Sequence, residues 1–116
     1  MSDLVWSIKN GELDQVQLAL EAKSHDINSE VNGRYPLHYA ADYGQYDVLE
    51  YLINKGANIN IMDKHGITPL LAAIWEGHTK CVKLLLEKGA EQNGKTPDGK
   101  SYIEAAEKEE IRRLLS

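Results

Sequence analysis

Apolar side chains recur at helical spacing in two stretches of the chain. In "VLEYLI", which starts at Val48, and in "CVKLLL", which starts at Cys81, they occupy positions i, i+3 and i+4, the spacing that places them on one face of an α-helix. We therefore predict two amphipathic helices, over Val48–Asn54 and Cys81–Lys88. Equivalent positions of the two stretches lie 33 residues apart, so the second stretch repeats the pattern of the first.

A short first helix is predicted immediately before each of these two. Pro36 and Pro69 suit the first position of a helix, where the missing N–H costs no hydrogen bond and the fixed φ is already helical. Thr68 can supply the N-cap oxygen in front of the second short helix. Gly44 or Gly77 follows each short helix and can adopt the positive φ of a tight turn. The predicted short helices cover Pro36–Tyr43 and Pro69–Glu76.

The glycines follow the same period. Three sets are spaced by 33 residues: Gly33, Gly66 and Gly99; Gly11, Gly44 and Gly77; Gly56 and Gly89. A fixed period of this length indicates a repeat protein in which each unit is one supersecondary element. We predict an all-α solenoid forming a single domain over residues 1–116, with four stacked helix-turn-helix units at about 1–32, 33–65, 66–98 and 99–116. Protruding turns join the units.

The two central units resemble the ankyrin repeat. Aligned at the 33-residue period, "GRYPLHYAADYGQYDVLEYLINKGANIN" and "GITPLLAAIWEGHTKCVKLLLEKGAEQN" match at apolar positions along their whole length. The outer units depart from the pattern, as terminal caps of a solenoid do. In the first, Ser24 lies near the position of the later glycines, so its turn must adopt another conformation. In the last, Tyr102 replaces the proline, about four residues are missing, and the charged run 107–110 is expected to be solvated.

The resemblance extends to one group of ankyrin proteins. "IKNGELDQV", "DKHGITPLLAAIWEGHTKCVKLLLEKGA" and "PDGKS" look like the myotrophin-like family of stand-alone, four-repeat proteins, in order and over essentially the full chain. This resemblance implies a cytosolic protein that binds the heterodimeric actin capping protein and sequesters it from filament barbed ends. It also implies an alternative partner, the Rel-type transcription factors.

Composition and charge narrow the classes of partner. The 116 residues carry a net charge of −5, the wrong sign for wrapping nucleic acid, so a basic protein surface is the favoured ligand. No apolar run approaches the roughly 20 residues of a membrane helix, and the start lacks the pattern of a secretory signal. The single cysteine cannot form an internal disulfide, which agrees with a reducing compartment. We expect a monomer in the cytoplasm, with the nucleus as a second compartment.

One motif formally suggests nucleotide binding. Residues Gly89 to Thr96 read G-x-x-x-x-G-K-T, which is the phosphate-loop pattern. A phosphate loop runs from a strand into a helix whose free N–H groups face the phosphates. Here a predicted helix precedes the motif and the turn at Pro97 follows it. We therefore expect no nucleotide site, no cofactor and no enzymatic activity.

Histidine and cysteine side chains raise the question of a metal site. His78 and Cys81 could share a helical face, but a zinc site needs three or four protein ligands and there is no second cysteine. Cys81 falls among the apolar positions of its helix, so we predict a buried, inert thiol. The family resemblance implies that His38 hydrogen-bonds between neighbouring units, in preference to a catalytic or ligand role.

Positions that the repeat leaves free form the candidate binding groove. A solenoid presents a continuous surface, which here should comprise the last residues of each short helix and the tips of the turns. The helix ends are Lys9 and Asn10, Asp42 and Tyr43, Trp75 and Glu76, and Lys108 and Glu109; the turn tips are Val31, Asn32, Arg34, Lys64, His65 and Ile67.

Aromatic side chains are the favoured contact residues in this groove. Trp75 and Tyr43 offer large contact areas at low cost in conformational entropy, while Asp42 and Glu76 would meet basic residues of the partner. The alternative for Trp75 is a covering role over neighbouring helix ends. Trp6 falls at a position that is core in the central units, so packing is favoured over partner contact. Lys64 and His65 are interpreted as solvated turn residues, with partner contact as the alternative.

Overall fold

The helices pair along the chain in the computed structural model, which describes residues 3–22 and 26–116. Ser24 lies outside these described residues. The helices are α1 (Asp3–Lys9), α2 (Leu13–Glu21), α3 (Pro36–Asp42), α4 (Tyr46–Asn54), α5 (Pro69–Glu76), α6 (Thr79–Glu87), α7 (Tyr102–Ala105) and α8 (Glu109–Leu115).

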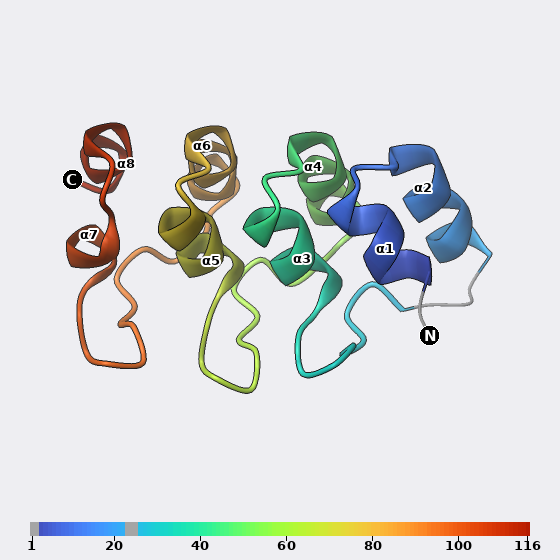
Figure 1. The fold of residues 1–116 in the computed structure, drawn as a ribbon, viewed down its shortest axis with the longest axis horizontal. Coiled ribbons are helices and arrows are strands. Elements are labelled where there is room, and N and C mark those ends of the chain that lie inside the picture. The colour runs from blue at the N-terminus through green and yellow to red at the C-terminus, as the bar shows by residue number, and fades with distance from the viewer. Residues whose placement is uncertain (1–2, 23–25) are drawn as a thin grey trace.

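The helices form two rows (Figure 1). The first row contains α1, α3, α5 and α7, and the second contains α2, α4, α6 and α8. Each unit packs on the next, since α3 contacts α1, α4 and α5, and the stack extends over 40 × 24 × 21 Å. The turns that precede α3, α5 and α7 project beyond the first row (Figure 1). The predicted all-α solenoid is confirmed.

The long helices begin earlier than the apolar spacing predicts. α4 starts at Tyr46 and α6 at Thr79, each two residues before the first buried apolar residue of its helix. Apolar spacing marks only the face of a helix that packs inward, so it cannot locate an exposed first turn. The glycines between the helices behave as predicted: Gly44 has a φ of 67° and Gly77 a φ of 73°.

The core lies between the two rows and between successive units. The predicted apolar faces supply it: Val48, Leu49 and Leu52 from α4 and Val82 and Leu85 from α6 are fully buried. The predicted N-cap of α5 is also present, because the Leu71 amide donates to Thr68 Oγ1 at 3.2 Å.

Cys81 belongs to this core. Its side chain is buried, and burial raises the pKa of the thiol to about 11. A thiolate is the reactive form of cysteine, so we expect the thiol to react with a disulfide reagent only as fast as the protein opens. The measurement compares reaction rates in buffer and across a urea series. A rate in buffer equal to that of the unfolded chain would contradict this expectation.

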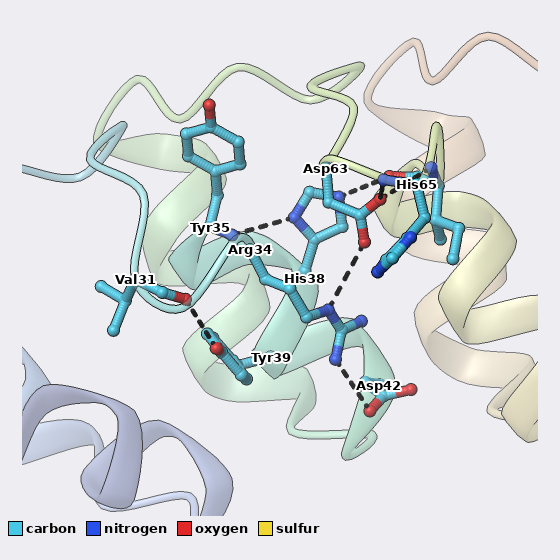
Figure 2. A network of polar contacts seen from close by, with 9 residues as sticks. Val31, Arg34, Tyr35, His38, Tyr39, Asp42, Asp63 and His65 are labelled. Atoms are coloured by element: carbon cyan, nitrogen blue, oxygen red, sulfur yellow. Dashed lines mark hydrogen bonds and ion pairs between the residues drawn. The ribbon is translucent and has the colours of Figure 1, made fainter.

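His38 joins the second and third units, as the family resemblance implied. Its Nδ1 accepts from the Tyr35 amide at 3.1 Å, and its Nε2–H donates to the Ile67 carbonyl at 2.6 Å (Figure 2). The side chain is fully buried, so both ring nitrogens are occupied by structural hydrogen bonds.

The buried imidazole makes stability depend on pH. Burial lowers the pKa of His38 below its ordinary 6.5, so between these two values the unfolded chain binds more protons than the folded protein. Stability should therefore fall as the pH drops below about 6.5. We expect His38→Gln to weaken this fall in stability between about pH 7 and about pH 5. Urea unfolding at both pH values measures it; an unchanged pH dependence in the variant would assign the effect to other groups.

A second series of inter-unit hydrogen bonds secures the ends of the first-row helices. Gln45 Nε2 donates to the Lys9 carbonyl at 2.8 Å, His78 Nε2–H donates to the Asp42 carbonyl at 2.9 Å, and Lys108 Nζ donates to the Gly77 carbonyl at 2.7 Å. These contacts satisfy carbonyl groups that a helix end leaves free. His78 thus has a structural role at the junction of the second and third units.

The same contacts correct the prediction for the last unit. Lys108 and Glu109 were predicted at the end of its first helix, but Lys108 is the N-cap of α8 and Glu109 is its first residue. The residues that the last unit lacks relative to the repeat are missing from its first helix, α7, which has only four residues. Lys108 therefore stands at the N-cap of the following helix, the position that His78 occupies one unit earlier. The charged run 107–110 is exposed as predicted.

The position of Tyr102 accounts for Gly94, the one glycine that does not follow the 33-residue period. Its buried hydroxyl hydrogen-bonds with Thr68 Oγ1 at 2.8 Å, and a Cβ on Gly94 would lie 2.8 Å from that hydroxyl oxygen. Gly94 therefore allows the tyrosine ring to approach. The formal phosphate loop consists of this segment between α6 and α7, and no strand precedes it and no helix starts at its end.

Candidate protein-binding surface

The predicted contact residues lie at the ends of the first-row helices. Trp75 and Glu76 end α5, Asp42 ends α3, and Tyr43 follows α3 as its C-cap. Trp75 exposes 44% of its surface and Tyr43 exposes 46%. Both aromatic side chains are therefore accessible to a partner, and a covering role stays the alternative for Trp75. That a partner contacts them stays a prediction.

Trp75 borders an open pocket at the junction of the third and fourth units. The pocket has a volume of about 450 Å³. Trp75 forms one wall, and the turn before α7 and α7 itself contribute Pro97, Asp98 and Glu104. Sequence reasoning missed the residues after the turn, because their proximity to Trp75 depends on how α7 packs against α5.

Lys9 and Tyr43 form one patch across the first two units. Lys9 Nζ lies 5.3 Å from the centre of the Tyr43 ring and 5.7 Å from that of Tyr39. Both distances are within the range of a cation–π interaction. Lys9 therefore stabilises the position of the exposed Tyr43 ring, in addition to any contact with a partner.

Arg34 pairs with two carboxylates within the chain (Figure 2). Its Nη1 lies 3.3 Å from Asp42 Oδ2, and its Nε lies 3.6 Å from Asp63 Oδ2. The guanidinium also faces the ring of Tyr39, at 5.3 Å from the ring centre. The charge of Asp42 is therefore compensated inside the molecule, so Glu76 is left as the helix-end carboxylate available to a basic partner.

The remaining predicted residues each have a structural contact as well as exposure. Asn10 Nδ2 donates to the Trp6 carbonyl at 2.8 Å and so caps α1. The Lys64 amide donates to the Gly33 carbonyl at 3.3 Å, and the His65 amide donates to Asp63 Oδ1 at 2.8 Å. The side chains of Asn10, Lys64 and His65 face solvent. For Lys64 and His65 this agrees with their interpretation as solvated turn residues.

The packing prediction for Trp6 is wrong. Its side chain is 63% exposed, whereas the equivalent residues of the next two units, Tyr39 and Ala72, are 6% and 2% exposed. Tyr39 lies on α3 and Ala72 lies on α5, and each of these helices packs against the preceding first-row helix, α1 or α3. Leu18, which the sequence analysis did not single out, is 62% exposed, although its equivalent Leu84 is 3% exposed. The 33-residue alignment pairs Leu18 with the buried Leu84, so this pattern alone predicts burial of Leu18 and not its exposure.

The described residues also bear on metal binding and on membrane insertion. Among the residues that the structure describes, no group of three or more His, Cys, Asp or Glu side chains could hold a metal ion. None of the described helices combines the length and the apolar character needed to cross a lipid bilayer.

Comparisons with known proteins place the chain in a family. The profile "Ankyrin repeats (3 copies)" matches residues 4–97. Myotrophin of Xenopus tropicalis is 54% identical over 97% of this chain and 96% of that protein. The 26S proteasome non-ATPase regulatory subunit 10 of Dictyostelium discoideum is 41% identical over 77% of this chain but 39% of that protein. The human BCL-6 corepressor-like protein 1 is 32% identical over 91% of this chain and 6% of that protein. The repeat period, the stacked helix pairs and the full-length match agree, and the chain belongs to the ankyrin-repeat family, among the myotrophin-like proteins.

Proposed function

We propose that the protein is a non-catalytic regulator that binds the heterodimeric actin capping protein and keeps it from filament barbed ends. The observation that carries the proposal is the likeness to myotrophin, which extends over 97% of the chain. The myotrophin-like resemblance implies this partner, and we propose the cytoplasm as the place of action.

The surface at the first-row helix ends suits a protein ligand. Trp75 and Tyr43 are half-exposed aromatic residues on rigid helix ends, and such residues dominate the energetics of protein interfaces. Glu76 beside Trp75 adds an exposed carboxylate. The chain carries a net charge of −5, which favours encounter with a basic surface.

A direct binding measurement tests this proposal. We expect the purified protein to form a one-to-one complex with purified capping protein in analytical ultracentrifugation, and the affinity to fall as the salt concentration rises. Absence of a complex at saturating protein would reject the proposal.

A lysate experiment separates the proposed partner from the alternative. The tagged protein is recovered from one lysate, and capping protein and Rel-type dimers are both quantified in the bound fraction. Enrichment of capping protein is expected. Enrichment of Rel-type dimers without capping protein would replace the proposed function with a role as a transcription-factor-binding module.

A further inference from the structure

The pocket beside Trp75 combines an aromatic wall with an excess of negative charge. Three carboxylates line it, those of Asp98, Glu104 and Glu107, against the single ammonium group of Lys100. Trp75 is 44% exposed, so its ring is accessible to a ligand in the pocket. A site of this composition favours a cation that also has a face to stack on the indole.

Local hydrogen bonds hold two of these carboxylates in place. Glu104 Oε1 accepts from the Ser101 amide at 2.8 Å, as part of the capping box that starts α7. Asp98 Oδ1 accepts from the hydroxyl of Thr96. These hydrogen bonds lower the pKa of both carboxyl groups, so both carry a charge at neutral pH.

The walls of the pocket are fixed relative to each other. The Thr68–Tyr102 hydrogen bond of 2.8 Å joins the start of α5 to the start of α7. The short pairing of Lys95 with Ser101 closes the turn between them. A ligand would therefore enter a site that is already formed, which reduces the entropy lost on binding.

The equivalent position one unit earlier has a different arrangement. Asp42 stands 33 residues before Trp75, and its carboxylate already pairs with Arg34 of the same chain. At the Trp75 position the chain supplies an aromatic ring in place of the aspartate and no arginine of its own. The junction of the third and fourth units is thus open to an arginine from another molecule.

We propose that this pocket binds an arginine side chain of the protein partner, with the guanidinium stacked on Trp75 and hydrogen-bonded to the carboxylates of Glu104 and Glu107. The inference rests on the proposed function, because it takes the partner to dock on the ends of the first-row helices. It extends the contact surface to α7. Arginine fits better than lysine because its planar, forked group can stack on a ring and reach two carboxylates together.

A peptide titration tests the pocket without capping protein. The ¹⁵N-labelled full chain is titrated with blocked Gly-Arg-Gly, and the indole N–H signal of Trp75 is followed by NMR after assignment with Trp6→Phe. We expect saturable shifts of this signal and of the α7 amides, with a Kd on the order of millimolar. The citrulline peptide, which has the same shape without the charge, should bind at least about fivefold more weakly.

Two matched variants decide whether the carboxylates are responsible. Glu104→Gln/Glu107→Gln should weaken the arginine peptide about fivefold, and glutamine retains the capping box of α7. The control Glu50→Gln/Glu87→Gln removes the same charge from α4 and α6 and should leave binding unchanged. Urea unfolding confirms that both variants are folded.

Several results would overturn the inference. These are equal shifts with the citrulline peptide, unchanged binding in Glu104→Gln/Glu107→Gln, or a lysine peptide that binds as tightly as the arginine peptide. Because capping protein is absent from the titration, such a failure leaves the proposed function standing. Conversely, arginine binding in the pocket without a capping-protein complex would reject the proposed function alone.

Discussion

Arg34→Met is expected to lower the free energy of unfolding by about 3 kcal/mol. The Asp63 side chain is 1% exposed, and Arg34 is the cation that lies beside its Oδ2, at 3.6 Å. That oxygen accepts no hydrogen bond, so the variant would leave a buried carboxylate without a compensating charge. Urea unfolding of the wild type and the variant measures the loss.

A double-mutant cycle separates charge from packing. Asp63→Asn keeps the Oδ1 acceptor that the amides of His65 and Ile67 use, but it removes the negative charge. Arg34→Met/Asp63→Asn should therefore be more stable than Arg34→Met alone. If the losses of the two single variants simply add, the arginine acts through packing on Tyr39 and the electrostatic explanation is wrong.

Trp75→Ala is expected to weaken binding to capping protein by about 2 kcal/mol or more, a rise in Kd of about thirtyfold. The melting temperature should change by no more than about 2 °C, because the side chain is half-exposed and lies outside the buried core. Isothermal titration calorimetry and thermal unfolding of the same preparations give the two values.

Tyr46→Ala provides the matched control for Trp75→Ala. Tyr46 is also a partly exposed aromatic residue, 37% exposed, but it lies on α4 in the second row. Its replacement should leave the affinity unchanged. The opposite outcome for Trp75→Ala, a large loss of stability with unaltered affinity, would assign the tryptophan to the core.

The repeat framework was predictable because local chemistry determines it. Proline at the start of α3 and α5, glycine at the turns and apolar spacing in α4 and α6 each impose one conformation, and the 33-residue period repeats them. The same alignment separated Trp75 and Glu76 from framework positions. Their exposure follows from the fold, because both residues lie at the end of a first-row helix.

Other features depend on contacts that no local pattern encodes. The exposure of Trp6, at a position whose equivalents in the next two units are buried, does not follow from its own sequence context. The pairing of Arg34 with Asp42 and Asp63 joins the start, the first helix and the end of the second unit, and its effect is to neutralise a predicted contact residue. Lys108 stands at the N-cap of α8 because the last unit is shortened within α7, and the repeat pattern alone does not locate this shortening.

Elongation of actin filaments from their barbed ends is the decisive test of the proposal that the protein sequesters capping protein. Pyrene-labelled actin is polymerised from seeds in the presence of enough capping protein to stop growth, and the protein is added in increasing amounts. We expect wild-type protein to restore elongation in a saturable way, and the Trp75→Ala variant to do so only at much higher concentration. Unchanged capping at saturating wild-type protein would contradict it.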